Sequence, residues 1–444
     1  MTISRRQFLK SSAALALLEQ ISRLDALAAP LAGSDYRALV CVFLFGGNDS
    51  NNTIVPTDAS GYADYLKARG NPATGGLGLA QSSLIALPGV NYGLHPGLAP
   101  LLPIWNAGHL AMQFNVGTLN RPISKAEYAN AANRPESLFS HSDQQAQWQS
   151  AVSSGPSRSG WAGRIADLAG SNGALPLIIS TGGNNLFAVG NATTPLAIPA
   201  NGGIGLNGFG SNPTGSPLFG AMTQLRGLDA GNQLVQAAAG TMNRAIAASS
   251  ALAPVLTGTS PVASLFAGQN NSVAQQLHQV ARVIGARQTL GAGRQIFFVS
   301  HGGYDTHTDQ LNRQATLLGQ LGTALKSFYD ALNQLGALSQ VTTFTQADFA
   351  RTLKPASGGG SDHAWGAHHF VMGGSVKGGT YGRFPSLVLG GADDVTNEGR
   401  WLPTTAVQQY GATLASWLGV QATDLPKVFP NIAAFPQANL GFMR

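Results

Sequence analysis

The chain of 444 residues contains a single cysteine, Cys41, so no disulfide can form within it. Its stability must come from side-chain burial, which a chain of this length can provide. Long apolar runs are also absent, and no segment after the first residues is apolar for long enough to cross a membrane. The composition therefore indicates a folded protein stabilised by its core alone.

Charge is scarce as well. Charged residues make up 10% of the chain, the formal net charge is +6, and the basic residues form no run. This thin positive excess gives no support to nucleic-acid binding. It suits a small anionic substrate or an envelope component as the partner, without selecting between them.

The motifs of several enzyme classes are missing. The sequence has no GxSxG, HExxH, Walker A or CxxC pattern, which argues against serine-triad, zincin, nucleotide-hydrolase and thiol-redox chemistry. Gly203, Gly205 and Gly208 have GxGxxG spacing, but no strand signal precedes them and no helix signal follows. We therefore interpret them as a loop and not as a dinucleotide site.

The N-terminus does carry a specific signal. Residues 4–10 match the twin-arginine export consensus, and a short apolar stretch and Ala26-Leu27-Ala28 follow. We predict that residues 1–28 are a twin-arginine signal peptide, read by the translocation machinery, and that the mature protein is periplasmic or extracellular. The alternative is an ordinary amphipathic first helix that happens to carry Arg5 and Arg6.

Buried strands recur along the mature chain. Short apolar or β-branched runs, each closed by a polar residue or glycine, occupy residues 38–45, 109–116, 175–180, 295–300, 341–345 and 386–389. Helical periods lie between several of them, at 277–284 and 318–335. This pattern predicts an α/β three-layer sandwich with a largely parallel central sheet. We expect one domain, 29–444, in which the Gly- and Asn-rich stretch of about 170–267 is an insertion or cap.

Imidazole and carboxylate side chains gather where these strands end, the edge at which such sheets bind ligands. The residues concerned are Asp49, His301, Asp305, His307, Asp348, Asp362, His363, His368 and His369. Such side chains bind zinc, manganese or iron, and we predict one or two divalent ions. The alternative is that these residues cap helices and close turns.

A second candidate segment is Ser140-His141-Ser142-Asp143, which opens a helix that carries Trp148. The Ser140 hydroxyl and the first amides of that helix can face an anion, so Ser140 is the candidate nucleophile. Its alternative role is that of a helix N-cap.

Seven short motifs together resemble the DUF1501 family: 45–56 (FGGNDSNNTIVP), 94–96 (LHP), 140–141 (SH), 160–164 (GWAGR), 303–307 (GYDTH), 348–351 (DFAR) and 362–363 (DH). They extend over most of the mature chain. The resemblance implies a fold similar to the alkaline phosphatase and sulfatase superfamily, in which a parallel sheet presents Asp and His side chains to two metal ions.

Carried over residue by residue, the resemblance implies metal ligation by Asp49, Asp305, His307, Asp348 and His363. The chain departs from the superfamily at Phe349, where an active phosphatase has a histidine. The loss of a nitrogen ligand weakens a second metal site unless Asp362 or His368 compensates. A sulfatase CxPSR motif is absent, since Cys41 lies inside a predicted strand.

Two function classes are consistent with these residues. The first is an exported, metal-dependent hydrolase of phosphate or related anionic esters, with zinc or manganese held by Asp49, Asp305, His307, Asp348, Asp362 and His363. Ser140, His141 and Arg351 are then the candidate catalytic residues, with Arg351 as a substrate clamp. The second class is a non-catalytic envelope or secretion-accessory protein that retains the fold. Association with carbohydrate or peptidoglycan through residues 170–267 is a third hypothesis.

Overall fold

The structure is a computed structural model, and it describes residues 35–169, 175–205, 216–228 and 231–444. The expected signal peptide, residues 1–28, lies outside the described residues. No described helix is long and apolar enough to span a bilayer.

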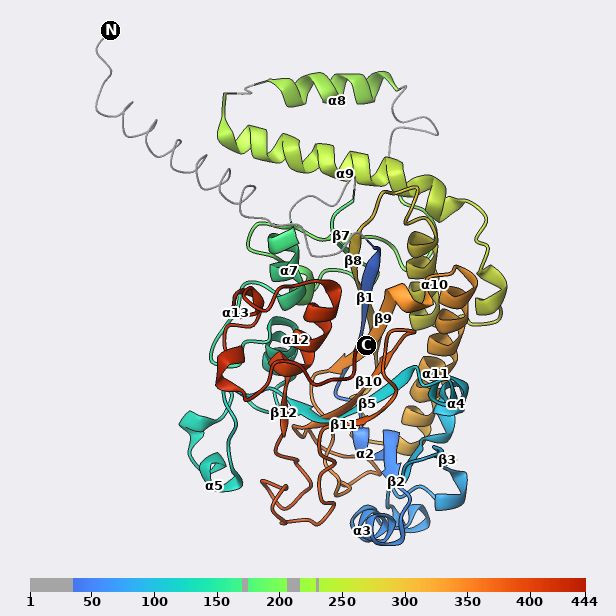
Figure 1. Ribbon diagram of the computed structural model, residues 1–444, viewed down its shortest axis with the longest axis vertical. Coiled ribbons are helices and arrows are strands. Elements are labelled where there is room, and N and C mark those ends of the chain that lie inside the picture. The colour runs from blue at the N-terminus through green and yellow to red at the C-terminus, as the bar shows by residue number, and fades with distance from the viewer. Residues whose placement is uncertain (1–34, 170–174, 206–215, 229–230) are drawn as a thin grey trace, which may run out of the picture.

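A central sheet of nine described strands forms the middle layer (Figure 1). The strands are β1 (Arg37–Phe45), β5 (Leu110–Gly117), β6 (Ile178–Ser180), β7 (Leu196–Ala197), β8 (Arg294–Gly302), β9 (Val341–Ala347), β10 (Ala367–Met372), β11 (Gly379–Tyr381) and β12 (Thr405–Ala406). Their order is β11-β5-β10-β9-β1-β8-β6-β7, and β12 pairs with β5. All pairings are parallel except those of β10. The prediction of a largely parallel sheet is confirmed.

Helices cover both faces of the sheet, which confirms the predicted three-layer α/β sandwich (Figure 1). One face carries α10 (Ser272–Gly285) and α11 (Gln310–Gln334), and the other carries α7 (Trp161–Ala169), α12 (Val407–Leu418) and α13 (Leu425–Val428). The side chains of β1 alternate between the two cores, Val40 and Val42 in one, Cys41 and Phe43 in the other. Residues 38–45 are continuously apolar because both faces of this strand are buried.

Shorter elements surround this sandwich. They are α2 (Ser50–Thr53), α3 (Ala59–Arg69), α4 (Leu102–Asn106), α5 (Lys125–Tyr128), α6 (His141–Ser150), and a small antiparallel sheet of β2 (Ile54–Pro56), β3 (Ile85–Ala86) and β4 (Tyr92–Leu94). Two of these elements contribute side chains to the carboxyl edge of the central sheet: α3 contributes Arg69, and α6 contributes His141 and Gln145.

One predicted strand is wrong. Residues 386–389 form no strand, although Leu387 is buried. The backbone amides of Ser386 and Gly390 donate to the carboxylates of Asp393 and Asp394 instead of to a neighbouring strand. Side-chain acceptors thus take the donors that a sheet would use.

The stretch expected to be an insertion contains β6, β7 and two helices that we did not predict, α8 (Pro217–Gly227) and α9 (Gln233–Thr257). Figure 1 shows both helices at one end of the molecule, beyond the sheet. Leu218 and Leu225 of α8 are mostly exposed. Gly208 of the GxGxxG pattern lies outside the described residues. That this stretch is a cap stays a prediction.

Candidate metal centre

Four loops meet at one edge of the sheet. β1, β8 and β9 are parallel and in register, with Phe45 beside Gly302 and Leu44 beside Ala347, so their carboxyl ends coincide. β10 runs the other way and starts at this edge, with Ala367 beside Val116. The β1 loop comes very close to the β8 loop, since a Cβ on Gly46 (φ +109°) would lie 2.4 Å from the Asp305 nitrogen. Glycine is therefore required there.

A His/Asp cluster occupies this edge. His141 at the start of α6, Asp305 after β8 and His363 before β10 present ligand atoms that lie within 4.8 Å of one another. His307 adjoins them, with Nε2 3.0 Å from Asp305 Oδ1 and 3.0 Å from His363 Nε2. The structure therefore contains a site with the donor types that hold a metal ion. Among the described residues it is the one such group.

The two imidazoles are oriented by bonds on their outer sides. His141 Nδ1 lies 2.7 Å from Asp348 Oδ2, and His363 Nδ1 lies 2.7 Å from the Phe139 carbonyl. A carboxylate and a carbonyl accept hydrogen bonds, so each Nδ1 carries the hydrogen and each Nε2 turns a lone pair to the cluster when the ring is neutral. The buried His141 Nε2 has no hydrogen-bond partner. Metal-binding histidines are characteristically held in this way.

His307 completes the pattern. Its Nδ1 lies 3.3 Å from Asp362 Oδ1. The Nε2 atoms of His307 and His363 lie 3.0 Å apart in a hydrogen bond, in which His307 donates because the His363 hydrogen is on Nδ1, bonded to the Phe139 carbonyl. Loss of that one hydrogen would leave both nitrogens able to bind one cation. The residues present therefore fit a divalent ion.

The pKa shifts have local causes. The bond to Asp348 raises the pKa of His141, against the effect of burial. Burial lowers the pKa of His363, and the charges of Arg351 and His141 act in the same direction. Burial would raise the pKa of Asp305, but the Arg351 bond and nearby positive charges outweigh it and lower that pKa. Asp305 is thus held ionised, as a ligand must be.

Arg351, expected to clamp substrate, is fully buried. Its Nη1 donates to Asp305 Oδ1 at 2.7 Å, and its other nitrogens bond to the side chain and the carbonyl of Ser361. The guanidinium has no free face for a substrate. Its geometry is that of a residue that positions Asp305.

Asp49 also differs from expectation. It lies at the carboxyl edge as predicted, but its carboxylate pairs with the buried guanidinium of Arg69 from α3. It also accepts from the Gln310 side chain and the Asn51 amide. Both oxygens are engaged, and Asp49 does not join the His/Asp cluster. A guanidinium thus provides the positive charge that we expected from a metal ion.

The other predicted site residues surround the cluster. Asp348 is fully buried and accepts from His141, Gln145 and the Gly46 amide, so it orients a ligand. Asp362 is half-exposed beside His307. The Ser140 hydroxyl donates to Asp143 at 2.5 Å and makes no capping bond to α6.

Three predicted histidines lie apart from the cluster. His301 bonds to Tyr304, while His368 and His369 are buried within β10. His368 packs against Phe114, and His369 packs against Trp148. His368 therefore does not compensate for Phe349 in a second site.

Phe349 packs directly against the cluster. Its ring centroid lies 4.8 Å from that of His141 and 4.6 Å from that of His363, and the side chain is fully buried. The residue that departs from the superfamily pattern thus provides an apolar wall for two ligand imidazoles.

Sequence reasoning missed Arg69, Gln310 and Phe139. Phe139 has a φ of +72°, which is rare for a residue other than glycine, and its carbonyl bonds to His363. Arg69 lies in α3, where no motif marked it. No sequence signal could have identified any of the three, because each acts through a contact between distant segments.

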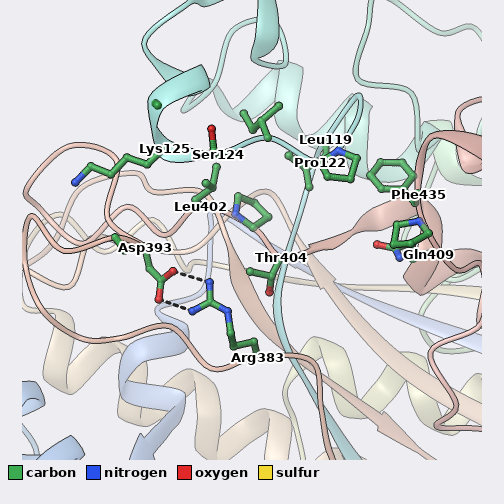
Figure 2. A pocket seen from close by; sticks show the side chains of 15 residues that line it. Leu119, Pro122, Ser124, Lys125, Arg383, Asp393, Leu402, Thr404, Gln409 and Phe435 are labelled. Atoms are coloured by element: carbon green, nitrogen blue, oxygen red, sulfur yellow. Dashed lines mark hydrogen bonds and ion pairs between the residues drawn. The ribbon is translucent and has the colours of Figure 1, made fainter.

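Two of the surface cavities differ in their relation to the cluster. One of about 410 Å³ is lined by His307 and Asp362 and therefore adjoins the cluster. The other, of about 620 Å³, has apolar walls that include Leu119, Leu402 and Phe435, and Figure 2 shows the paired side chains of Arg383 and Asp393 in it. None of the predicted site residues lines this second cavity.

The profile of the DUF1501 family, described as a protein of unknown function, matches residues 228–400. The predicted resemblance is thereby confirmed for a stretch that includes Asp305, His307, Asp348 and His363. Comparison of the sequence with curated proteins finds no significant match.

Among solved structures, the chain is similar to Ps i-CgsB in complex with k-i-k-neocarrahexaose, with a TM-score of 0.36 and 8% identity over 90% of this chain and 76% of that one. It is also similar to the phosphonate monoester hydrolase of Agrobacterium radiobacter, with a TM-score of 0.31 and 12% identity over 88% and 77%. Likeness at this level assigns neither a substrate nor a residue role to this chain.

Proposed function

We propose that this chain, which matches DUF1501 over residues 228–400, is an exported metal-dependent hydrolase of phosphate or related anionic esters. The observation that carries the proposal is the convergence of His141, Asp305 and His363 with both imidazoles bonded through Nδ1, so that their Nε2 atoms are left for a cation. His141 Nε2 makes no hydrogen bond and lies 3.5 Å from Asp305 Oδ2, which leaves its lone pair directed at the cluster.

Asp305, His141 and His363 would hold the ion, with His307 as a fourth ligand. Mixed nitrogen and carboxylate donors favour zinc, and manganese is the alternative. When bound, such an ion polarises an ester oxygen and stabilises the negative charge that develops on it. This assignment gives His141 a ligand role in place of the catalytic role expected from the sequence.

The remaining residues keep the ligands in place. Asp348 holds the His141 ring, the Phe139 carbonyl holds the His363 ring, and Arg351 holds Asp305. Because these partners fix the ligands before any ion or substrate arrives, little reorganisation is needed during the reaction.

Ser140 or a water molecule is the nucleophile in this proposal. The Ser140 hydroxyl already donates to Asp143, and that carboxylate can take the proton as the oxygen forms its bond to phosphorus. The bond from phosphorus to the ester oxygen then breaks, and the alcohol leaves with a proton taken from water or from Asp143. Ser140 directly precedes His141 in the chain, which ties its position to that of a ligand.

Metal analysis and kinetics test the proposal together. Protein purified from the periplasm should contain about one zinc or manganese ion per chain and should hydrolyse a simple aryl phosphate. His141→Ala and His363→Ala should each lower metal affinity and turnover by at least about a hundredfold, because loss of a direct ligand costs more than loss of a residue that only orients one. His278→Ala, on α10 and bonded to Ser260, is the matched control. Retention of the ion by both cluster variants would overturn the proposal.

Export is tested separately. Replacement of Arg5 and Arg6 by lysine should leave the precursor in the cytoplasm at full length, because the translocation machinery reads both arginines. Fractionation and intact-mass measurement distinguish the precursor from a form cleaved after Ala28. Unchanged export of the double variant would contradict the twin-arginine assignment.

A second function, a non-catalytic envelope protein with one structural ion, is favoured by Phe349. Its ring covers one side of the cluster, and the Asp49 position is closed by Arg69. In that case the ion would raise the melting temperature in the usual way for a ligand of the folded state, yet no aryl ester would be turned over.

A further inference from the structure

Arg400 connects the turn before the candidate nucleophile, Ser140, to the segment that carries a ligand of the cluster. Its Nε donates to the backbone carbonyl of His363 at 2.6 Å, and its guanidinium carbon lies over the Phe139 ring, 4.9 Å from the ring centroid. His363 Nδ1 in turn bonds to the Phe139 carbonyl at 2.7 Å. Arg400, His363 and Phe139 therefore form a closed set of contacts in which each residue touches the other two.

Arg400 is itself fixed through its backbone and its side chain. Its amide donates to the buried carboxylate of Asp394 at 3.1 Å, and the same carboxylate accepts from the Gly399 amide at 2.9 Å. Its Nη1 pairs with the Glu398 carboxylate and also donates to the Thr396 hydroxyl at 3.3 Å. The guanidinium thus has a set position, and its charge is already paired with Glu398.

The turn that contains Phe139 needs such support. Ser137 and Phe139 have φ values of +49° and +72°, in the left-handed region that is unfavourable for residues other than glycine. The Ser140 amide donates to the Ser137 carbonyl at 3.1 Å and closes the turn. A backbone of this kind persists only where surrounding contacts hold it, and the guanidinium over the Phe139 ring is one of these contacts. Ser140 ends the turn, so its position depends on how firmly the turn is held.

We propose that Arg400 is a positioning residue, which holds the Phe139 ring and thereby places the Ser140 hydroxyl at the His/Asp cluster, so that Ser140 and not a water molecule attacks the ester. This inference rests on the proposed function and selects one of its two nucleophiles. The serine oxygen bonds to phosphorus as Asp143 takes its proton, and the ester oxygen leaves with a proton as the alcohol. Water then cleaves the phosphoserine, which releases phosphate and restores the Ser140 hydroxyl.

Kinetics of the zinc-saturated mature protein test this role with two variants that break the same contact. Arg400→Met removes the guanidinium, and Phe139→Leu removes the aromatic face but keeps the carbonyl that bonds to His363. Each should lower kcat for an aryl phosphate by between about ten- and a hundredfold, because a nucleophile displaced by about 1 Å loses this much. KM and zinc affinity should change little, since neither side chain is placed against the substrate or the ion.

Three comparisons assign the loss to Ser140. The double variant of Arg400→Met with Phe139→Leu should lose no more than Arg400→Met alone, because one contact is broken in both. In a Ser140→Ala background, Arg400→Met should lower the residual turnover no further. A crystal structure of Arg400→Met should show the turn of residues 137–140 displaced while the His141 and His363 rings keep their places. Arg282→Met is the matched control, because its guanidinium bonds to the Val255 and Gly258 carbonyls.

Several results would overturn the inference and leave metal-dependent hydrolysis in place. They are wild-type kcat in Ser140→Ala or in Arg400→Met, an unmoved turn in the crystal structure of Arg400→Met, and a fall in zinc affinity that parallels the fall in kcat. Absence of zinc-dependent hydrolysis of aryl phosphates by the wild-type protein would instead overturn the proposed function, and this inference with it.

Discussion

Asp49 and Asp305 follow adjacent parallel strands, β1 and β8, and reach the same edge of the sheet, yet their surroundings differ. Asp49 is buried, 1% exposed, and is neutralised by Arg69. The Asp305 side chain is 44% exposed and faces three imidazoles. One carboxylate has become part of the core, while the other lies in a site open to ligands.

The two aspartates differ in environment because their partners differ: Asp49 pairs with a guanidinium, and Asp305 faces imidazoles. A guanidinium has no lone pair and no acceptor, so the Asp49 pair is complete and can be buried. An imidazole with its Nδ1 hydrogen engaged leaves a lone pair that needs a cation or a donor. The same Asp-after-strand pattern therefore leads to a structural ion pair in one place and to a candidate metal centre in the other.

The largest expected effect is a loss of stability when the buried pair of Asp49 and Arg69 is broken. Arg69→Met leaves the Asp49 charge buried without its partner, and the free energy of unfolding should fall by about 3–5 kcal/mol. The double variant Arg69→Met with Asp49→Asn should recover much of this loss, because no charge is then left unpaired. Urea denaturation measures both. Metal affinity should change little in the double variant, and its loss there would mean that Asp49 belongs to the metal centre after all.

A smaller effect is expected at Asp348, which touches the cluster only through His141. Asp348→Asn keeps the shape but weakens the hold on the His141 ring, and zinc affinity should fall by between about ten- and a hundredfold. Competition with a chromophoric chelator measures the affinity. The control is Asp330→Asn, which breaks a surface pair with Lys326. Unchanged zinc affinity in the Asp348 variant would show that the Asp348 charge does not support the His141 ring.

The smallest expected effect is on the pH dependence of stability. It comes from His368 and His369, whose imidazoles do not face the cluster. Burial lowers the pKa of His368 and of His369 to about 3, so both stay neutral in the folded chain while the unfolded chain takes up protons below about pH 6.5. Stability should therefore fall as the pH is lowered from about 6.5, by about 1.4 kcal/mol per pH unit for each histidine.

His369→Gln should reduce the slope of the free energy of unfolding against pH by the contribution of one histidine. The measurement is the free energy of unfolding of metal-free protein between pH 7 and pH 5, where comparison of slopes removes the constant cost of the substitution. An unaltered slope would show that His369 is accessible to protons in the folded state.

Particular residues show how far prediction from sequence could reach. The run 38–45 predicted β1 correctly because a strand buried on both faces has no polar position. Residues 386–389 looked similar and form no strand; the Ser386 amide donates to Asp393 and the Gly390 amide just beyond the run donates to Asp394, and no local pattern reveals this. The reversed strand β10 was missed because it contains two histidines that looked like ligands and are instead packed among aromatic rings.

The amino-acid sequence by itself determined the layered α/β architecture and the identity of the strands whose ends carry Asp and His, since periodicity and side-chain chemistry are properties of contiguous residues. Only the tertiary structure decided which of those side chains share a cluster, that Arg69 closes the Asp49 position, and that Arg351 supports Asp305 from within the core. These outcomes depend on contacts between segments that are tens to hundreds of residues apart in the sequence. The role of a charged side chain is set by the residue that it contacts in the folded chain, and local sequence does not specify that residue.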